Sequence, residues 1–219
     1  MAAVSKLIAI SFIIVSFIIG LISFYLVSDL PKQERKKQMD DMISNLTNFV
    51  IFIWIAKIIL NFSIFMEDPL AILAYPSDSS AFYLALLFSG IFLYYKSLRK
   101  QMDVPMFVNS FIHVFIVASF LYEFIQFVWN DNPYSLGYMI LLALLLVLFL
   151  FSHHKLARDT LTIMILTAWS AGMFILFAVQ PYVTVFGYLM SPWFVAVFFV
   201  IGFTLILLNK RKKGLNGRN

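Results

Sequence analysis

Apolar residues fill seven long stretches of the chain, with short polar segments between them. A helix of roughly 17–25 residues spans the hydrocarbon core of a bilayer, and each stretch has that length. The predicted transmembrane helices cover residues about 7–28, 43–65, 80–98, 105–129, 135–152, 159–179 and 191–208. The pattern predicts an all-α integral membrane protein, a seven-transmembrane-helix bundle forming one polytopic domain over residues 1–219, with a basic cytoplasmic tail at 209–219.

Local signals mark several boundaries of these helices. Asp103 with Pro105, and Ser191 with Pro192, place a capping residue beside a proline near the first turn. Asn132-Pro133 is typical of a tight turn. The first stretch is longer than the apolar region of a signal peptide, and the basic segment 31–37 follows it in place of a cleavage site. We therefore expect the first helix to be retained.

Basic residues are concentrated in alternate polar segments. They are Lys32, Arg35, Lys36 and Lys37 after the first helix, Lys96, Arg99 and Lys100 after the third, Lys155 and Arg158 after the fifth, and Lys210, Arg211, Lys212, Lys213 and Arg218 in the tail. Lys and Arg are retained on the cytoplasmic side of membranes. The distribution predicts an N-out/C-in topology.

Aromatic residues gather near the predicted helix ends. Those near outer ends are Tyr75 (which lies outside the residues that the structure describes), Tyr83, Trp129, Tyr134, Tyr138, Tyr182, Tyr188 and Trp193, and those near inner ends are Tyr25, Tyr94 and Tyr95. Tyr and Trp are enriched where membrane meets water. We interpret all of them as an interfacial belt.

Composition supports a membrane protein and excludes other classes. Hydrophobic residues make up 62% of the chain and charged residues 12%, which no water-soluble fold of this length accommodates. The net charge of +5 is spread over several segments and is not the basic face of a nucleic-acid-binding protein. The chain has no cysteine, so it forms no disulfide and no thiolate metal site.

Two formally charged residues lie well inside predicted spans, Lys57 and Glu123. A bare charge at the bilayer centre costs roughly 2.5–3.5 kcal/mol even on a lenient scale, so each requires a partner or water. Both fall in the outer half of their helices, and we expect them to approach one another or to line one pocket. Three interpretations are open: a buried ion pair that fixes packing, a functional pocket, and independent snorkelling.

Other polar residues share the helix of Glu123. Asn109, His113 and Gln126 complete the predicted polar pocket with Lys57 and Glu123, and Asn109 and His113 share a face by their spacing of four. No carboxylate lies near His113 in sequence, which favours packing over a role as base or ligand. No metal site and no cofactor are predicted.

Three segments carry a resemblance to a known family. They are Ile55-Ala56-Lys57-Ile58-Ile59, Asp68-Pro69-Leu70-Ala71-Ile72-Leu73 and Gly187-Tyr188-Leu189-Met190-Ser191-Pro192. With the seven-helix N-out/C-in pattern, they resemble prolipoprotein diacylglyceryl transferase, which moves diacylglyceryl from phosphatidylglycerol onto a cysteine. The resemblance covers about 43–213 and implies a bacterial plasma membrane location and a membrane lipid partner, such as an anionic phospholipid.

The chain departs from that family at the catalytic motifs. The family's His-Gly-Gly would fall near 79–82, where no histidine stands. Its Gly-Arg-Ile-Gly-Asn-Phe falls on 121–127, where Glu123 replaces the arginine and Gln126 the asparagine. The arginines and glutamate expected in helix six are absent from 169–180. The resemblance therefore implies a degenerate relative of the transferase.

Three functions are consistent with these observations. The first is a non-catalytic protein that binds a lipid or a membrane partner in an outer-half cavity. The second is a small-solute or ion transporter with a polar track. The third is a surviving lipid- or lipoprotein-modifying transferase in which Glu123 would be the base and Lys57 the anion binder.

Overall fold

The protein is an all-helical chain with a single short hairpin in its described part. The structure is a computed structural model that describes residues 2–70, 72, 78–153 and 155–216, with side chains described over 7–70, 72, 78–153 and 155–204. Six described helices are long and apolar enough to cross a membrane. The chain divides into two compact units, unit 1 (1–28 and 108–219) and unit 2 (29–107).

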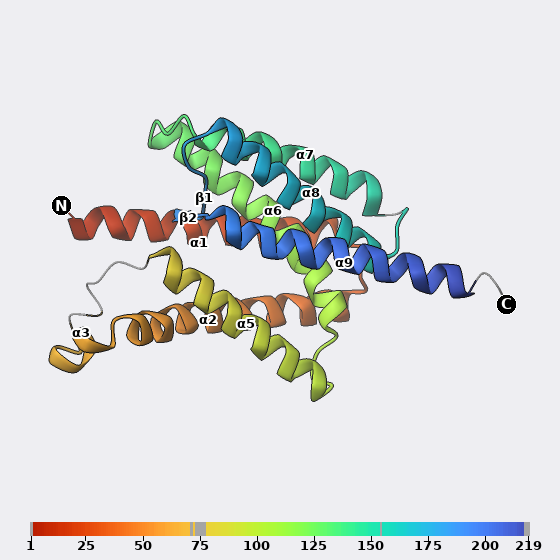
Figure 1. Ribbon diagram of the computed structural model, residues 1–219, viewed down its shortest axis with the longest axis horizontal. Coiled ribbons are helices and arrows are strands. Elements are labelled where there is room, and N and C mark those ends of the chain that lie inside the picture. Colours follow the sequence, from red (N-terminus) through yellow and green to blue (C-terminus); the bar gives the residue numbers. More distant parts are fainter. Residues whose placement is uncertain (1, 71, 73–77, 154, 217–219) are drawn as a thin grey trace. The chain divides into compact units, whose positions relative to one another are not determined.

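Unit 2 is built on a pair of helices, α2 (Lys32–Leu60) and α5 (Ser79–Leu98), with the short α3 (Phe62–Glu67) after α2. The pair runs antiparallel (Figure 1). Phe52 of α2 packs edge-on against Phe88 and Phe92 of α5, with ring centroids 6.1 and 5.8 Å apart. The Asp78 carboxylate accepts from the amide of Ala81 at 2.9 Å and caps α5.

Unit 1 contains α1 (Ala2–Val27), α6 (Val104–Trp129, from residue 108), α7 (Ser135–His153), α8 (Arg158–Val179) and α9 (Pro192–Asn216). The hairpin of β1 (Thr184–Val185) and β2 (Tyr188–Leu189) joins α8 to α9. Helices α1, α7 and α9 run one way and α6 and α8 the other (Figure 1). The segment Lys155–Arg158 joins the end of α7 to the start of α8. Because α7 and α9 run in the same direction, this segment lies at the same end of unit 1 as the C-terminal end of α9.

Small residues allow close helix packing in unit 1. A Cβ added at Gly20 of α1 would lie 2.8 Å from the carbonyl oxygen of Val114 on α6. A Cβ at Gly172 of α8 would overlap the Leu141 side chain of α7, and one at Gly202 of α9 would lie 2.8 Å from the Thr167 hydroxyl of α8. Such close approaches are typical of membrane helix interfaces. Among the candidate spans, α6 has the largest buried share.

Most predicted helix ends agree with the structure within a residue or two, and four differ: α1 begins at Ala2, α2 begins at Lys32 and ends at Leu60, and α9 ends at Asn216. The segment 31–37, expected to be a loop, begins α2 at Lys32, and Gln38 and Met42 are buried on that early part. Helix α9 continues to Asn216 through the predicted tail, whose side chains lie outside the described part. Asp103 caps α6 as predicted, its carboxylate accepting from the amide of Met106 at 3.1 Å.

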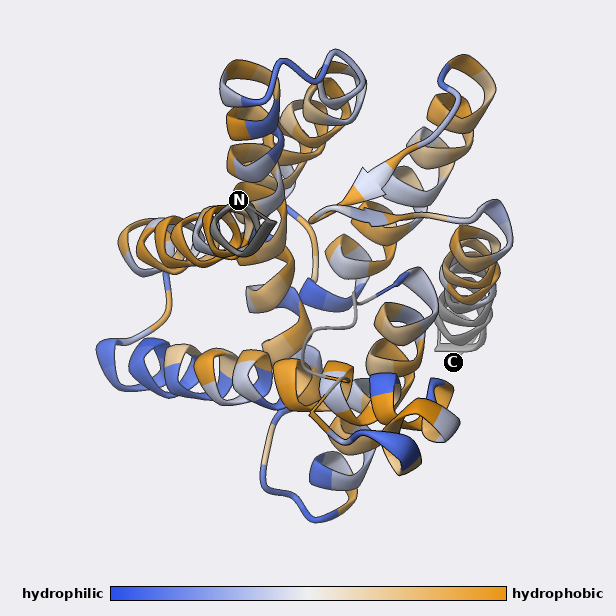
Figure 2. Ribbon diagram, turned by 90° about the vertical axis from the view of Figure 1, so that its left-hand side faces the viewer, coloured by the Kyte–Doolittle hydropathy of each residue, from blue (hydrophilic) through white to orange (hydrophobic). Residues whose placement is uncertain are grey.

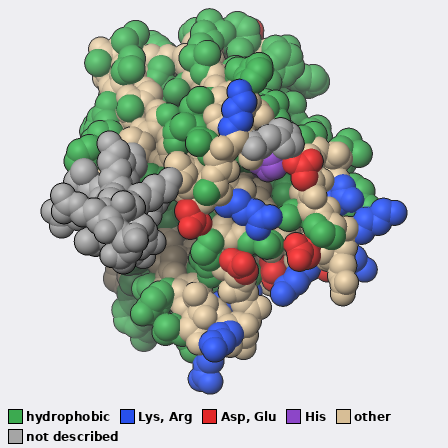
Figure 3. Space-filling model, turned by 90° about the vertical axis from the view of Figure 1, so that its right-hand side faces the viewer, with side chains coloured by type: hydrophobic (Ala, Val, Ile, Leu, Met, Phe, Trp, Pro, Cys, Tyr) green, Lys and Arg blue, Asp and Glu red, His purple; other side chains and the backbone are tan. Residues whose placement is uncertain are grey.

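The surface is that of a protein surrounded by lipid. The helices are hydrophobic over most of their length, and hydrophilic residues concentrate at their ends and in the connections (Figure 2). The face seen in Figure 3 carries both basic and acidic side chains, with hydrophobic side chains around them. Trp129 and Trp193 are 74% and 61% exposed near helix ends, as the predicted belt requires.

Candidate functional site

The buried carboxyl group of Glu123 is the centre of the candidate site. Glu123 lies on α6 and is only 1% exposed. Its Oε1 atom has no hydrogen-bond partner within the described part of the chain. A buried polar atom without a partner costs free energy, and a buried charge costs more. Such a group in a membrane helix is a candidate for function.

Hydroxyl groups from two helices surround Glu123. Ser135 begins α7, and its hydroxyl lies near enough to the Glu123 carboxyl to interact with it. Tyr138, one turn further along α7, also interacts electrostatically with Glu123. Ser119, one turn before Glu123 on α6, is directed at the Tyr138 hydroxyl. We call Ser119, Glu123, Ser135, Tyr138 and Trp169 the Glu123 cluster.

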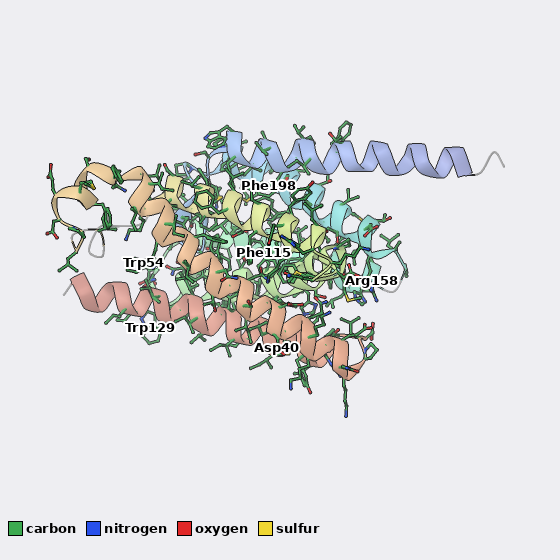
Figure 4. The ribbon with its side chains drawn as sticks, turned by 90° about the horizontal axis from the view of Figure 1, so that it is seen from below. Asp40, Trp54, Phe115, Trp129, Arg158 and Phe198 are labelled. Atoms are coloured by element: carbon green, nitrogen blue, oxygen red, sulfur yellow. The ribbon has the colours of Figure 1, made fainter. Side chains whose placement is uncertain are left out.

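Trp169 of α8 fixes the orientation of Tyr138. Its indole Nε1 donates a hydrogen bond of 3.1 Å to the Tyr138 hydroxyl oxygen, and Tyr138 is 1% exposed. The indole ring also packs edge-on against the ring of Phe198 on α9, with ring centroids 6.0 Å apart. Phe198 is labelled in Figure 4. Because the indole occupies a lone pair of the tyrosine oxygen, the tyrosine proton remains free to be directed at Ser119 or Glu123.

The hairpin packs against the same part of α6. Phe186, at its turn, is 8% exposed and contacts Phe17 of α1 at 4.9 Å, and Phe115 and Tyr122 of α6 at 5.8 and 5.5 Å. Phe115 lies among the side chains of the bundle in Figure 4. Phe186 and Gly187 both have positive φ, 50° and 82°. Two such residues between paired strands are typical of a type I′ turn.

The predicted residues Asn109 and His113 lie well away from Glu123 along α6. Fourteen residues separate Asn109 from Glu123 in sequence, which is about 21 Å of helix. Asn109 Nδ2 donates to the Arg158 carbonyl oxygen at 3.4 Å and to the Thr162 hydroxyl at 3.3 Å. This group therefore joins α6 to the start of α8.

His113 is held by packing and one hydrogen bond. Its Nε2 lies 3.1 Å from the Ser23 hydroxyl of α1. Its ring meets Phe24 of α1 and Phe149 of α7 edge-on, with centroids 6.1 and 5.4 Å away. These contacts suit the packing role favoured from the sequence.

Gln126 stands at the edge of the Glu123 cluster. It is half-buried, and its Oε1 accepts from Asn130 Nδ2 at 2.7 Å. Its side chain also interacts with the Tyr122 hydroxyl. Gln126 thus lies nearer the C-terminal end of α6 than Glu123 does, and its polar atoms interact with Tyr122 and Asn130, which are close to it in sequence.

Lys57 lies on α2 in unit 2 and is 5% exposed. Its ammonium group lies 5.2 Å from the ring centre of Trp54, one turn earlier. A cation over an indole face is attracted by the ring quadrupole. Glu123 belongs to unit 1, so the expected approach of Lys57 to Glu123 stays a prediction.

Sequence reasoning did not identify four members of the Glu123 cluster. The assignment of Tyr138 to the interfacial belt is wrong, because the side chain is enclosed and bonded to Trp169. Ser119 and Ser135 carry no signal in sequence, since serine is common in membrane helices. The one available signal was spacing: Ser119 lies four residues before Glu123, on the same face.

Among the described residues, no group of three or more His, Cys, Asp or Glu side chains could hold a metal ion. No family model, no curated protein and no solved structure matches the chain. The chemistry of the Glu123 cluster therefore has to be judged from its own residues.

Proposed function

We propose that the chain is a non-catalytic binding protein of a bacterial plasma membrane, built on a scaffold resembling prolipoprotein diacylglyceryl transferase, and that it binds a membrane lipid through the Glu123 cluster. The observation that supports binding is the buried Glu123 carboxyl with its unpaired Oε1. A guest that supplies a hydrogen-bond donor or a positive charge satisfies this atom.

The residues around Glu123 support binding over catalysis. Transfer of a diacylglyceryl group requires a held anionic head group and an activated thiol. The basic side chains described in unit 1 are Lys155 and Arg158, and the Asn109 contact places Arg158 at the opposite end of α6 from Glu123. Hydroxyl and indole groups surround the carboxyl instead.

The topology forms part of the same proposal. We infer seven spans with the N-terminus outside and the C-terminus inside, the seventh being α9. Its described apolar part is 192–204, followed by apolar sequence to 208. The antiparallel order of helices within each unit supports this arrangement, since 14 of the 16 Lys and Arg residues lie in alternate connections or in the tail, Lys6 and Lys57 being the exceptions.

Lipid retention tests the proposal. The full chain, purified in mild detergent with phosphatidylethanolamine, is examined by native mass spectrometry beside Glu123→Gln. Phosphatidylethanolamine carries an ammonium group that can pair with a carboxylate, so we expect the wild type to retain it and the variant to lose most of it. Ser170→Ala is the matched control, because Ser170 is buried but bonds only the Leu166 carbonyl of its own helix.

Two results contradict the proposal. If Glu123→Gln retains as much phosphatidylethanolamine as the wild type, the Glu123 carboxyl has no role in lipid binding. Transfer of diacylglyceryl from phosphatidylglycerol to a lipobox peptide by the purified wild type makes the protein an enzyme, with Glu123 as the first residue to examine as base.

A transporter is the second candidate, supported by the length of the polar stripe on α6. Asn109, His113 and Glu123 recur at intervals that keep them on one buried face. Between His113 and Glu123, however, α6 presents the buried Ile116, and α7 contributes the buried Leu142 and Leu145 to the interior of unit 1. Solute flux into vesicles that depends on both His113 and Glu123 would favour transport over lipid binding.

A further inference from the structure

Three buried oxygen atoms at one place in unit 1 make no hydrogen bond of good geometry with any described residue, although they lie near one another and near Tyr138. They are Glu123 Oε1, Ser119 Oγ and Ser135 Oγ, and the three residues are 1%, 1% and 3% exposed. Serine hydroxyls rotate freely and usually pair with the nearest acceptor. The buried Ser16 and Ser170 do so, each bonding a carbonyl of its own helix at 2.7 and 2.9 Å. Ser119 and Ser135 leave that bond unmade and remain directed at the Glu123 cluster.

The atoms of this cluster are hard oxygen donors with one negative charge. The carboxylate, two serine hydroxyls and the Tyr138 hydroxyl supply the oxygen atoms, and the indole of Trp169 holds the tyrosine in place. Oxygen donors of this kind prefer hard cations. A single carboxylate is neutralised by a monovalent ion, whereas a divalent ion would leave a net positive charge inside the membrane.

Access also limits the guest. Glu123 is 1% exposed and its neighbours come from α6, α7 and α8. A guest that reaches Oε1 without separating these helices has to be small. A bare ion of about 2 Å diameter meets this limit, and a lipid head group meets it only if the helices part.

We propose that Glu123, Ser119, Ser135 and Tyr138 form a binding site for Na⁺ within the α6–α7–α8 bundle. This inference rests on the proposed binding role of the Glu123 cluster and adds a second guest: Na⁺ occupies the cluster while the helices are closed, and the ammonium of a lipid head group replaces it when they part. The ion bridges α6 to α7, since Ser119 and Glu123 come from one helix and Ser135 and Tyr138 from the other.

Thermal unfolding of the purified full chain tests the site. A ligand that binds only the folded state raises the unfolding temperature with its concentration. The midpoint is measured in NaCl, KCl and choline chloride at constant ionic strength, so that screening is the same in each. We expect a saturable rise with Na⁺ that K⁺ and choline do not reproduce.

Variants separate the site from a general salt effect. Glu123→Gln should abolish the Na⁺-dependent rise, and Ser119→Ala or Ser135→Ala should raise the Na⁺ concentration at half-saturation about tenfold, the effect of one lost polar contact. Ser16→Ala, equally buried on α1, should behave as the wild type. If Glu123→Gln does not fold, the two serine variants carry the comparison.

The outcomes are decisive in both directions. A midpoint that does not depend on Na⁺ in the wild type means that a proton or water satisfies the carboxyl, and overturns the site. A Na⁺ effect unchanged in all three variants overturns it as well. If the wild type shows no Na⁺ effect but still retains phosphatidylethanolamine in a way that depends on Glu123, the Na⁺ site is wrong and the proposed lipid binding stands. The two proposals can therefore fail separately.

Discussion

The indole nitrogen of Trp169 and the hydroxyl oxygen of Tyr138 are joined by a 3.1 Å hydrogen bond across the α7–α8 interface. Tyr138 is 1% exposed, so water does not compete for this bond. The bond fixes the orientation of the Tyr138 side chain, which also interacts with Glu123 on α6. One contact between two aromatic residues therefore organises the Glu123 cluster.

Removing the indole donor should loosen the bundle. Trp169→Phe keeps an aromatic ring and deletes the N–H, which leaves the Tyr138 oxygen without that donor and should lower the free energy of unfolding by about 1–2 kcal/mol. Denaturation in mixed detergent micelles measures the change. Trp193→Phe is the control, because Trp193 is 61% exposed and should tolerate the exchange. Equal losses in the two variants would mean that ring packing alone, and not the hydrogen bond, matters at Trp169.

Gly187 in the hairpin should resist substitution. Its φ of 82° is in the region that disfavours a side chain, and an added Cβ would lie 3.0 Å from the Tyr122 hydroxyl. Gly187→Ala should therefore cost about 1–2 kcal/mol of unfolding free energy.

Gly90 provides the matched control for the hairpin. It lies within α5 with nothing within 4 Å of an added Cβ, so Gly90→Ala should cause no loss of stability. If Gly187→Ala is as stable as Gly90→Ala, the positive φ of Gly187 and its close approach to Tyr122 do not contribute to stability.

The positions of the six helices long enough to cross a membrane follow from the sequence, for a physical reason. Uninterrupted apolar runs leave no other structure for the backbone in lipid, and residues such as Asp103 mark where a helix begins. The largest departure is at α2, whose start at Lys32 lies in a charged segment. A hydropathy pattern reports where the chain is apolar, whereas a helix can continue into water with any good helix former.

The Glu123 cluster was predictable only in part. Glu123 itself could be recognised, because a carboxylate in an apolar run is costly wherever it points. Tyr138 could not, because a tyrosine three residues into α7 suits an interface as well as an interior. Its burial depends on how α7 is rotated and on α8 bringing Trp169 beside it, and both are set by packing that no local pattern contains.

The contact between Ser23 and His113 should couple α1 to α6. Ser23→Ala and His113→Ala each remove one partner of the 3.1 Å contact, and the double variant should show a coupling of about 1 kcal/mol in a double-mutant cycle. Ser11→Ala in place of Ser23→Ala should give no coupling, since Ser11 bonds the Leu7 carbonyl of its own helix. A coupling near zero for Ser23 would show that His113 is held by Phe24 and Phe149 alone.

The proposed threading of the chain makes an asymmetric prediction for reporters placed at two positions. With seven spans and the N-terminus outside, Asp131 follows four crossings and Arg211 follows seven. A reporter inserted at Asp131 should therefore be on the exterior, and one fused behind Arg211 in the cytoplasm. The physical reason is that Lys and Arg at alternate turns resist transfer across the membrane, whereas the Asp131 turn carries none.

The pair of reporters also tests α9 by itself. If the helix from Pro192 does not cross the membrane, only six crossings precede Arg211, and the two reporters will lie on the same side. A periplasmic phosphatase and a cytoplasmic fluorescent protein, each fused at both positions, give opposite signals for the two sides. An exterior signal behind Arg211 together with an exterior signal at Asp131 would remove the seventh span and leave the other six. A cytoplasmic signal at Asp131 would instead show that the proposed orientation is reversed, because each helix before Asp131 would then cross the membrane in the opposite direction.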